Sequence, residues 1–432
     1  MLLASLLLTV AALPVSPQDS AIDLNLAHRY FQEAQWLSDD DNGQLWGMPL
    51  IGPMIFVDVR SHDAVTNRQP PDEAFKEEDG IWVGHWPTNK PIANTATEWG
   101  NQEWTMVLWP LPTRRTERAK LMAHELFHRI QPALGLNPMS PDNAQMDKFD
   151  GRVWLRMELM ALSKALSAPV SEKKPFMEDA LLFRAYRQSL FPGSKKNEDE
   201  LDLNEGLAEF TGIMLKGTWE PEARLWQGNQ LKQIADTQLS TYSRSFPYWT
   251  GSSYALLLDV EDGVQDAKTP WRKQVKPDTS LAGTLAERIG WHESVDEKTA
   301  VARAEKYGYD KVLKEEQEKE KKTQELIAKY HRQFFDGPVL VLPLAKMQYS
   351  FDPRDVFHID EGTVYGTATI IDEWGTLTVT GGALITPDFQ SARVEAPKSA
   401  GDLSGTGWTL KLNDGWKVVA GKRKGDFTVV KT

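Results

Sequence analysis

Two histidines four residues apart, His124 and His128, enclose a glutamate in the pentapeptide HELFH. On a helix, residues at this spacing lie one above the other, so both imidazoles can reach one ion. Glu125 then stands beside the ligands and can serve as the base that activates water. Because the chain has no cysteine, any metal site must use His, Asp and Glu. The pattern predicts Zn²⁺-dependent hydrolytic chemistry and requires a third protein ligand.

Two glutamates further along the chain are candidates for that ligand. Glu158, in GRVWLRMELMALSKAL, has apolar neighbours at helical spacing, so it needs zinc, an arginine or a backbone cap as its partner. Glu205, in LDLNEGLAEFTGIMLKG, shares a helix face with Glu209 and with the small residues Ala208 and Gly212. There the first carboxylate can bind the metal while the second orients a ligating imidazole. The alternative is an ordinary amphipathic helix with two surface glutamates.

The pair HELFH and LNEGLAEF resembles the gluzincin peptidases, the superfamily of thermolysin and the aminopeptidase N family. In that superfamily the third ligand is a Glu on a second helix, often within a NEG-x-A-x-[YF] pattern. The resemblance implies Glu205 as the third zinc ligand and Glu209 as a supporting acid. The pattern maps onto Asn204, Glu205, Gly206, Ala208 and Phe210.

The spacing departs from that family, because 76 residues separate His128 from Glu205, more than in aminopeptidase N relatives. An insertion that carries the Glu158 helix must therefore loop out between the two ligand helices. Glu158 accordingly remains the alternative third ligand.

A later segment, FPYWTGSSYALLLD, resembles the PYxxG segment of the aminopeptidase N family. The resemblance implies that Tyr248 steadies the oxyanion, a task that suits a phenol because it can donate a hydrogen bond to developing negative charge. A core tyrosine is the alternative, with Tyr254 and Tyr242 as other donors. The strand Glu103–Trp109 is either the edge strand that lines the cleft in related peptidases or a central strand.

Around these motifs the chain reads as an α+β protein with a zincin-like catalytic domain. A small mixed sheet is expected from the strand-like runs Met54–Val59, Gly80–Trp86 and Glu103–Trp109. The zinc helix can begin near Thr113 or Thr116 and ends before Pro132. The expected divisions are a signal peptide (1–20), an α/β part (21–112), the helical zinc-site part (113–260), a further helical region (261–336) and an all-β domain (337–432).

The N-terminus carries a short apolar run, Leu2 to Leu13, followed by small residues. This is typical of a signal peptide, although a basic n-region is missing, and it predicts a secreted or periplasmic protein. The run is too short for a permanent span, and no other segment is apolar enough to cross a membrane. The net charge of −12 argues against a nucleic-acid partner. The highly charged run Lys314–Lys322 is expected to form a solvated helix face.

Together these features favour a zinc-dependent peptidase that acts on peptide or protein substrates. The rival is an exported, non-catalytic binding protein with a structural metal. That rival would be favoured by a closed site in which Glu158 and Glu205 both bind the ion. No feature of the sequence predicts the oligomeric state or separates endopeptidase from exopeptidase cleavage.

Overall fold

The computed structural model describes residues 22–432 except 138, 218–219, 238, 266–268 and 353–354. The chain divides into two compact units, residues 1–316 and 317–432, which are described separately below. The expected signal peptide lies outside the described residues. Among the residues that are described, no helix is long and apolar enough to cross a membrane.

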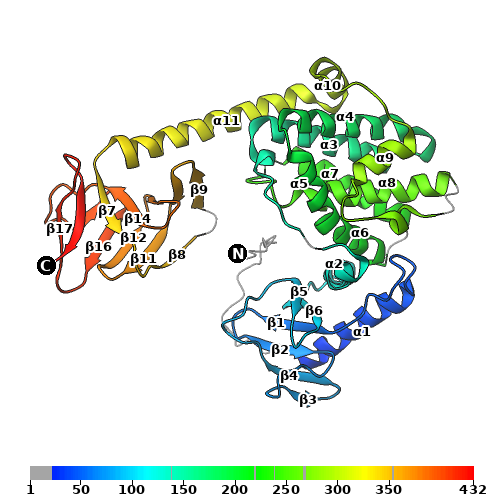
Figure 1. Ribbon diagram of the computed structural model, residues 1–432, viewed down its shortest axis with the longest axis horizontal. Helices are drawn as coiled ribbons and strands as arrows, with labels where there is room; N and C mark the ends of the chain where they lie inside the picture. The colour runs from blue at the N-terminus through cyan, green and yellow to red at the C-terminus, as the bar shows by residue number, and fades with distance from the viewer. Residues whose placement is uncertain (1–21, 138, 218–219, 238, 266–268, 353–354) are drawn as a thin grey trace. The chain divides into compact units, whose positions relative to one another are not determined.

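The first unit begins with a helix and a mixed six-stranded sheet (Figure 1). The sheet has the order β3-β4-β2-β1-β6-β5, and its one parallel pair among the described strands is β1 with β6. The elements are α1 (Leu24–Asp41), β1 (Met54–Asp58), β2 (Asp63–Thr66), β3 (Lys76–Glu78), β4 (Ile81–His85), β5 (Thr95–Glu98) and β6 (Glu103–Trp109).

Strand β1 shows why the sheet lies between two apolar layers. Its side chains alternate between faces, so Met54 and Phe56 join the main core with the helices, whereas Ile55 and Val57 join a separate aromatic-rich cluster. Phe31 of α1 stacks on Phe56 with ring centroids 4.2 Å apart. The first face of the sheet therefore packs against the helices that carry the candidate site.

Helices form the remainder of the first unit and share its main core (Figure 1). The helices are α2 (Arg115–Ile130), α3 (Phe149–Ser167), α4 (Lys174–Leu190), α5 (Ser194–Leu201), α6 (Leu207–Leu215), α7 (Glu220–Asp236), α8 (Thr250–Val264), α9 (Leu281–Ile289), α10 (Glu297–Ala304) and α11 (Tyr309–His331). A π-helical turn, Asp202–Gly206, joins α5 to α6. Helix α11 starts in the first unit and ends in the second.

The second unit is built from two β-sheets that share one apolar core. One has the order β17-β18-β7-β14-β13-β10-β9 and the other β15-β16-β12-β11-β8. The strands are β7 (Val339–Pro343), β8 (Gln348–Phe351), β9 (Val356–Ile359), β10 (Gly362–Tyr365), β11 (Ala368–Asp372), β12 (Gly375–Val379), β13 (Ala383–Ile385), β14 (Ser391–Glu395), β15 (Ser404–Gly405), β16 (Trp408–Leu412), β17 (Trp416–Ala420) and β18 (Phe427–Lys431).

The structure has the expected α+β organisation: an N-terminal mixed sheet, a central helical region and C-terminal β-sheets. Helix α2 begins at Arg115 and has no side-chain cap, so neither Thr113 nor Thr116 caps it. It ends at Ile130, shortly before Pro132, as expected.

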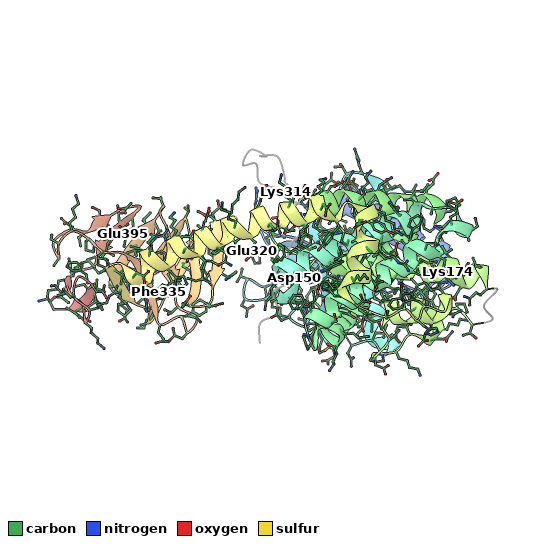
Figure 2. The ribbon with its side chains drawn as sticks, turned by 90° about the horizontal axis from the view of Figure 1, so that it is seen from above. Asp150, Lys174, Lys314, Glu320, Phe335 and Glu395 are labelled. Carbon is green, nitrogen blue, oxygen red and sulfur yellow. The ribbon has the colours of Figure 1, made fainter. Side chains whose placement is uncertain are left out.

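The structure decides two further points. Strand β6 lies between β1 and β5, so of the two placements that the sequence left open it has the central one, and β5 forms that edge of the sheet. Within the charged run of α11, whose course Lys314 and Glu320 mark in Figure 2, Glu316 is fully buried rather than solvated. Its carboxylate pairs with Arg152 at 2.6 Å and with Arg156 at 2.8 Å.

Candidate metal centre

Helix α2 presents His124, Glu125 and His128 from within the core of the first unit. Its apolar residues Met122 and Phe127 are completely buried. His124 and Glu125 are each only 5% exposed. The helix thus holds both imidazoles and the neighbouring carboxylate in surroundings with little water.

The π-helical turn Asp202–Gly206 brings Glu205 up to α2. A Cβ atom on Gly206 would lie 2.7 Å from the Cα atom of Gly251 in α8, so the two backbones touch at a pair of glycines. A Cβ atom on Gly212 of α6 would lie 2.6 Å from the carbonyl oxygen of Lys120 in α2. These glycines therefore allow α2, α8 and the π-helical turn with α6 to approach one another closely around Glu205.

Three ligand-type atoms converge between these segments. The Nε2 atoms of His124 and His128 lie 3.1 Å apart. Glu205 Oε2 lies 3.5 Å from each of them. Within the part of the chain that the structure describes, these residues form the one such cluster of His, Asp and Glu.

The geometry and electrostatics of this cluster fit a divalent cation. Tetrahedral Zn²⁺ with bonds of about 2.0–2.1 Å keeps its ligand atoms roughly 3.3 Å apart, close to the separations seen here. Burial alone would lower the pKa of His124, but the carboxylates of Glu205 and Glu209 outweigh it and raise that pKa to about 10. The site therefore favours positive charge between its imidazoles and carboxylates.

Glu125 lies beside the three ligand atoms but outside their cluster. Its Oε2 atom is buried and has no hydrogen-bond partner. Burial raises the pKa of this carboxyl, against the lowering effect of the two histidines. A buried carboxylate oxygen without a donor is costly, and a water molecule next to the ligands would satisfy it.

Glu209, one turn after Glu205, supports His124 from behind. Its Oε2 lies 3.4 Å from His124 Nδ1, and its Oε1 lies 2.5 Å from Lys120 Nζ. Burial would raise the pKa of Glu209, but Lys120 and His124 lower it. An ionised carboxylate on Nδ1 keeps the lone pair of His124 on Nε2, toward the cluster.

His128 is supported through two amides. Its Nδ1 lies 3.1 Å from Gln131 Oε1. Gln131 Nε2 donates to Asn204 Oδ1 at 3.2 Å, and Asn204 Nδ2 donates to Glu205 Oε1 at 3.2 Å. A continuous hydrogen-bonded chain thus joins His128 of α2 to Glu205 of the π-helical turn.

Tyr248 lies directly against the cluster. Its ring stacks on His124 with centroids 5.4 Å apart, and its hydroxyl donates to Glu205 Oε2 at 2.7 Å. Burial, followed by the charge of Glu205, raises the pKa of the phenol, so it stays protonated and remains a donor. The two tyrosines named as alternatives face elsewhere: Tyr254 donates to Glu158 and Tyr242 to the carbonyl of Thr237.

Glu158, the alternative third ligand, is not part of the cluster. It is fully buried and pairs with Arg187 and, at 3.4 Å, with Arg184. Tyr254 donates to it at 2.8 Å. Its buried charge is thus compensated by arginines and a phenol, which is one of the alternatives that the sequence left open.

Three supporting contacts were missed from the sequence: Lys120, Gln131 and the amide of Asn204. Lys120 lies four residues before His124 and Gln131 three residues after His128, so both share the face of the histidines. That spacing is a usable signal. Their partners cannot be found in this way. Glu209 and Asn204 lie far along the chain from Lys120 and Gln131, and local spacing does not relate them.

Comparison with known proteins identifies no family or function for this chain. No family model matches the chain, and no curated protein or solved structure matches it either. The geometry of the cluster and its neighbours therefore has to carry the functional argument.

Proposed function

We propose that this protein is a zinc-dependent peptidase of the gluzincin type. The observation that carries the proposal is the convergence of His124, His128 and Glu205 beside Glu125, whose buried Oε2 atom has no hydrogen-bond partner. The order of HELFH, NEGLAEF and PYWTG along the chain, and its resemblance to the gluzincin peptidases, supports the same reading.

Zn²⁺ bound by the three residues would lower the pKa of a water molecule and polarise the scissile carbonyl. Glu125, beside the three ligands, would serve as the base that takes up a proton from the attacking water and as the acid that returns it to the leaving amine. Burial raises the pKa of this carboxyl, which favours proton uptake by Glu125. The phenol of Tyr248, which stays protonated, can turn from Glu205 to the oxyanion and donate to it.

Strand β5 offers a place for the substrate backbone. It is the edge strand next to β6, and it packs against α2, as Figure 1 shows. Its residues Thr95–Thr97 are half-buried and Glu98 is exposed. An extended peptide can pair with such an edge through main-chain hydrogen bonds.

The alternative, a binding protein with a structural metal, requires a closed site. Structural zinc sites in proteins nearly always have four protein ligands. The described cluster has three members, and Glu158 lies in an arginine cluster instead. This arrangement favours an open, catalytic coordination.

The test is the Glu125→Gln variant, with Glu117→Gln on the exposed part of the same helix as its control. Zinc-loaded proteins are incubated with a mixed peptide library, and the products are analysed by mass spectrometry. We expect Glu125→Gln to retain zinc and to cleave at least about 10²-fold more slowly, while Glu117→Gln cleaves like the wild type. A wild type that binds zinc and cleaves no peptide would refute the peptidase proposal.

A further inference from the structure

The two amides between His128 and Glu205 form a chain whose direction is fixed. For His128 to present a lone pair at Nε2, its Nδ1 must carry the hydrogen, so Gln131 Oε1 accepts at 3.1 Å. Gln131 Nε2 then donates to Asn204 Oδ1, and Asn204 Nδ2 donates to Glu205 Oε1. The chain ends on a carboxylate, which only accepts. Reversing either amide would place two acceptors against each other.

The two amides of this chain are buried, so water has little access to repair a mismatch between them. Gln131 is 1% exposed and Asn204 is 6% exposed. Inside a protein, an unpaired buried donor or acceptor loses its hydrogen bond without compensation. The identity of each group in the chain, and not just its polarity, therefore matters.

We propose that Gln131 is a positioning residue that links the two ligands His128 and Glu205, and that its function depends on its being an amide. Its oxygen fixes the tautomer of His128, and its nitrogen, through Asn204, holds Glu205 Oε1 so that Oε2 faces the histidines. The inference rests on the metal site proposed above. It deepens that proposal, because α2 and the π-helical turn become one coupled unit.

Because of this coupling, a carboxylate at position 131 is expected to weaken zinc binding, although a carboxylate at such a position usually strengthens it. A carboxylate behind a ligating histidine usually strengthens metal binding, because it raises the basicity of the imidazole. At position 131 a carboxylate would accept from His128 but could not donate to Asn204. If Asn204 turned to donate to it, its Oδ1 would face Glu205 Oε1. Gln131→Glu should therefore weaken zinc binding.

The experiment measures Zn²⁺ affinity by competition with a chromophoric chelator, and thermal unfolding reports whether each variant is folded. We expect Gln131→Glu and the uncharged Gln131→Met each to bind Zn²⁺ about 10–100-fold more weakly than the wild type. The control is Gln227→Glu, which also buries a carboxylate. Gln227 is 1% exposed and bonds to Ser252 and the carbonyl of Tyr248, not to a ligand. Its variant should bind zinc like the wild type.

A double variant tests the direction of the chain itself. In Gln131→Glu/Glu205→Gln, Asn204 can turn, donate to position 131 and accept from the new amide at position 205. The penalty of Gln131→Glu should then be smaller in the Glu205→Gln background than in the wild type, by on the order of tenfold.

Equal penalties in both backgrounds, or a Gln131→Glu variant that binds zinc as tightly as the wild type, would overturn the inference and leave the metal site intact. A folded wild type that binds no Zn²⁺ would instead overturn the proposed function, and the inference with it.

Discussion

One oxygen of Glu205 is shared by both imidazoles and the phenol of Tyr248. Glu205 Oε2 lies 3.5 Å from His124 Nε2 and from His128 Nε2, and it accepts from Tyr248 at 2.7 Å. A cation bound between the histidines would compete with the phenol for this oxygen. The third member of the candidate metal site is thus also the hydrogen-bond acceptor of the Tyr248 hydroxyl.

Replacement of Tyr248 by Phe distinguishes two roles for its hydroxyl, donation to the oxyanion and coordination of the metal. If it steadies the oxyanion, Tyr248→Phe should bind zinc normally and cleave peptides about 10²–10³-fold more slowly, with the loss in kcat. If it is instead a ligand, the variant should lose zinc affinity. Steady-state kinetics together with chelator competition distinguish the outcomes, and unchanged kcat would remove Tyr248 from the mechanism.

At the scale of elements, the π-helical turn is the part that the whole site depends on. It packs on α8 through Gly206 and Gly251, and on α2 through the neighbouring helix α6. Its first residue, Asp202, belongs to an ionic cluster with Arg184 and Glu158. π-helical turns occur often at functional sites. Here the turn places Glu205 between α2 and α8.

The glycine contact gives a direct test of this packing. Gly206→Ala would put a Cβ atom 2.7 Å from the Gly251 Cα atom, and neither backbone can yield cheaply. We expect about 1–3 kcal/mol of destabilisation and weaker zinc binding, because the turn that carries Glu205 must move. Gly263→Ala, later in α8, is the control: its Cβ would meet nothing within 4 Å. It should be neutral or slightly stabilising in thermal unfolding.

The ionic cluster predicts a pH dependence of stability. Burial raises the pKa of Asp202 from 3.8 to about 7, while Arg184 and Thr250 act in the opposite direction. Arg184 also forms ion pairs with Glu158 and Asp199, so it stabilises the charge of Asp202 less than an arginine with one partner would. Between these two pKa values the folded state holds a proton that the unfolded state has released.

In that window, the contribution of Asp202 to stability is present at low pH and is lost as pH rises from about 4 to about 7. The unfolding free energy of the wild type minus that of Asp202→Asn should therefore become smaller as pH rises across this range. Urea unfolding at several pH values measures it. A difference that is constant, or that grows with pH, would contradict the assigned protonation of Asp202.

The features that the sequence predicted are those set by local spacing. His124, Glu125 and His128 share one helix turn, and Glu209 follows Glu205 by one turn, so helical geometry alone relates them. The sequence could not relate Glu158 to Arg184 or Lys120 to Glu209, because these pairs form only when helices pack. The choice between an edge and a central position for β6 stayed open for the same reason, since strand order in a sheet is not local.

For the whole molecule, all residues of the candidate site belong to the first unit. The second unit has its own core, in which Trp374 and Trp408 are buried. Helix α11 crosses the boundary, and Glu315 and Glu316 near its start pair with Arg156 of α3. The beginning of α11 is therefore expected to be part of what holds the first unit together.

Truncation tests this division. A chain that ends after His331 retains Glu316 and should bind zinc as the full chain does. A chain that ends after Gly308 takes both carboxylates away from Arg156 and the buried Val312 out of the core, so it should be less stable than the longer fragment. Thermal unfolding and zinc affinity of both chains are the measurements. Loss of zinc binding in the longer fragment would show that the C-terminal unit supports the site.

The central claim is that His124, His128 and Glu205 hold a metal ion, and it is tested most directly by metal analysis of purified protein. Wild type, Glu205→Ala and Glu158→Gln are loaded with Zn²⁺, dialysed and measured by mass spectrometry of the metal, with circular dichroism to confirm folding. We predict about one zinc per chain in the wild type and in Glu158→Gln, and none in Glu205→Ala. Zinc retained by folded Glu205→Ala but lost from folded Glu158→Gln would contradict the assignment.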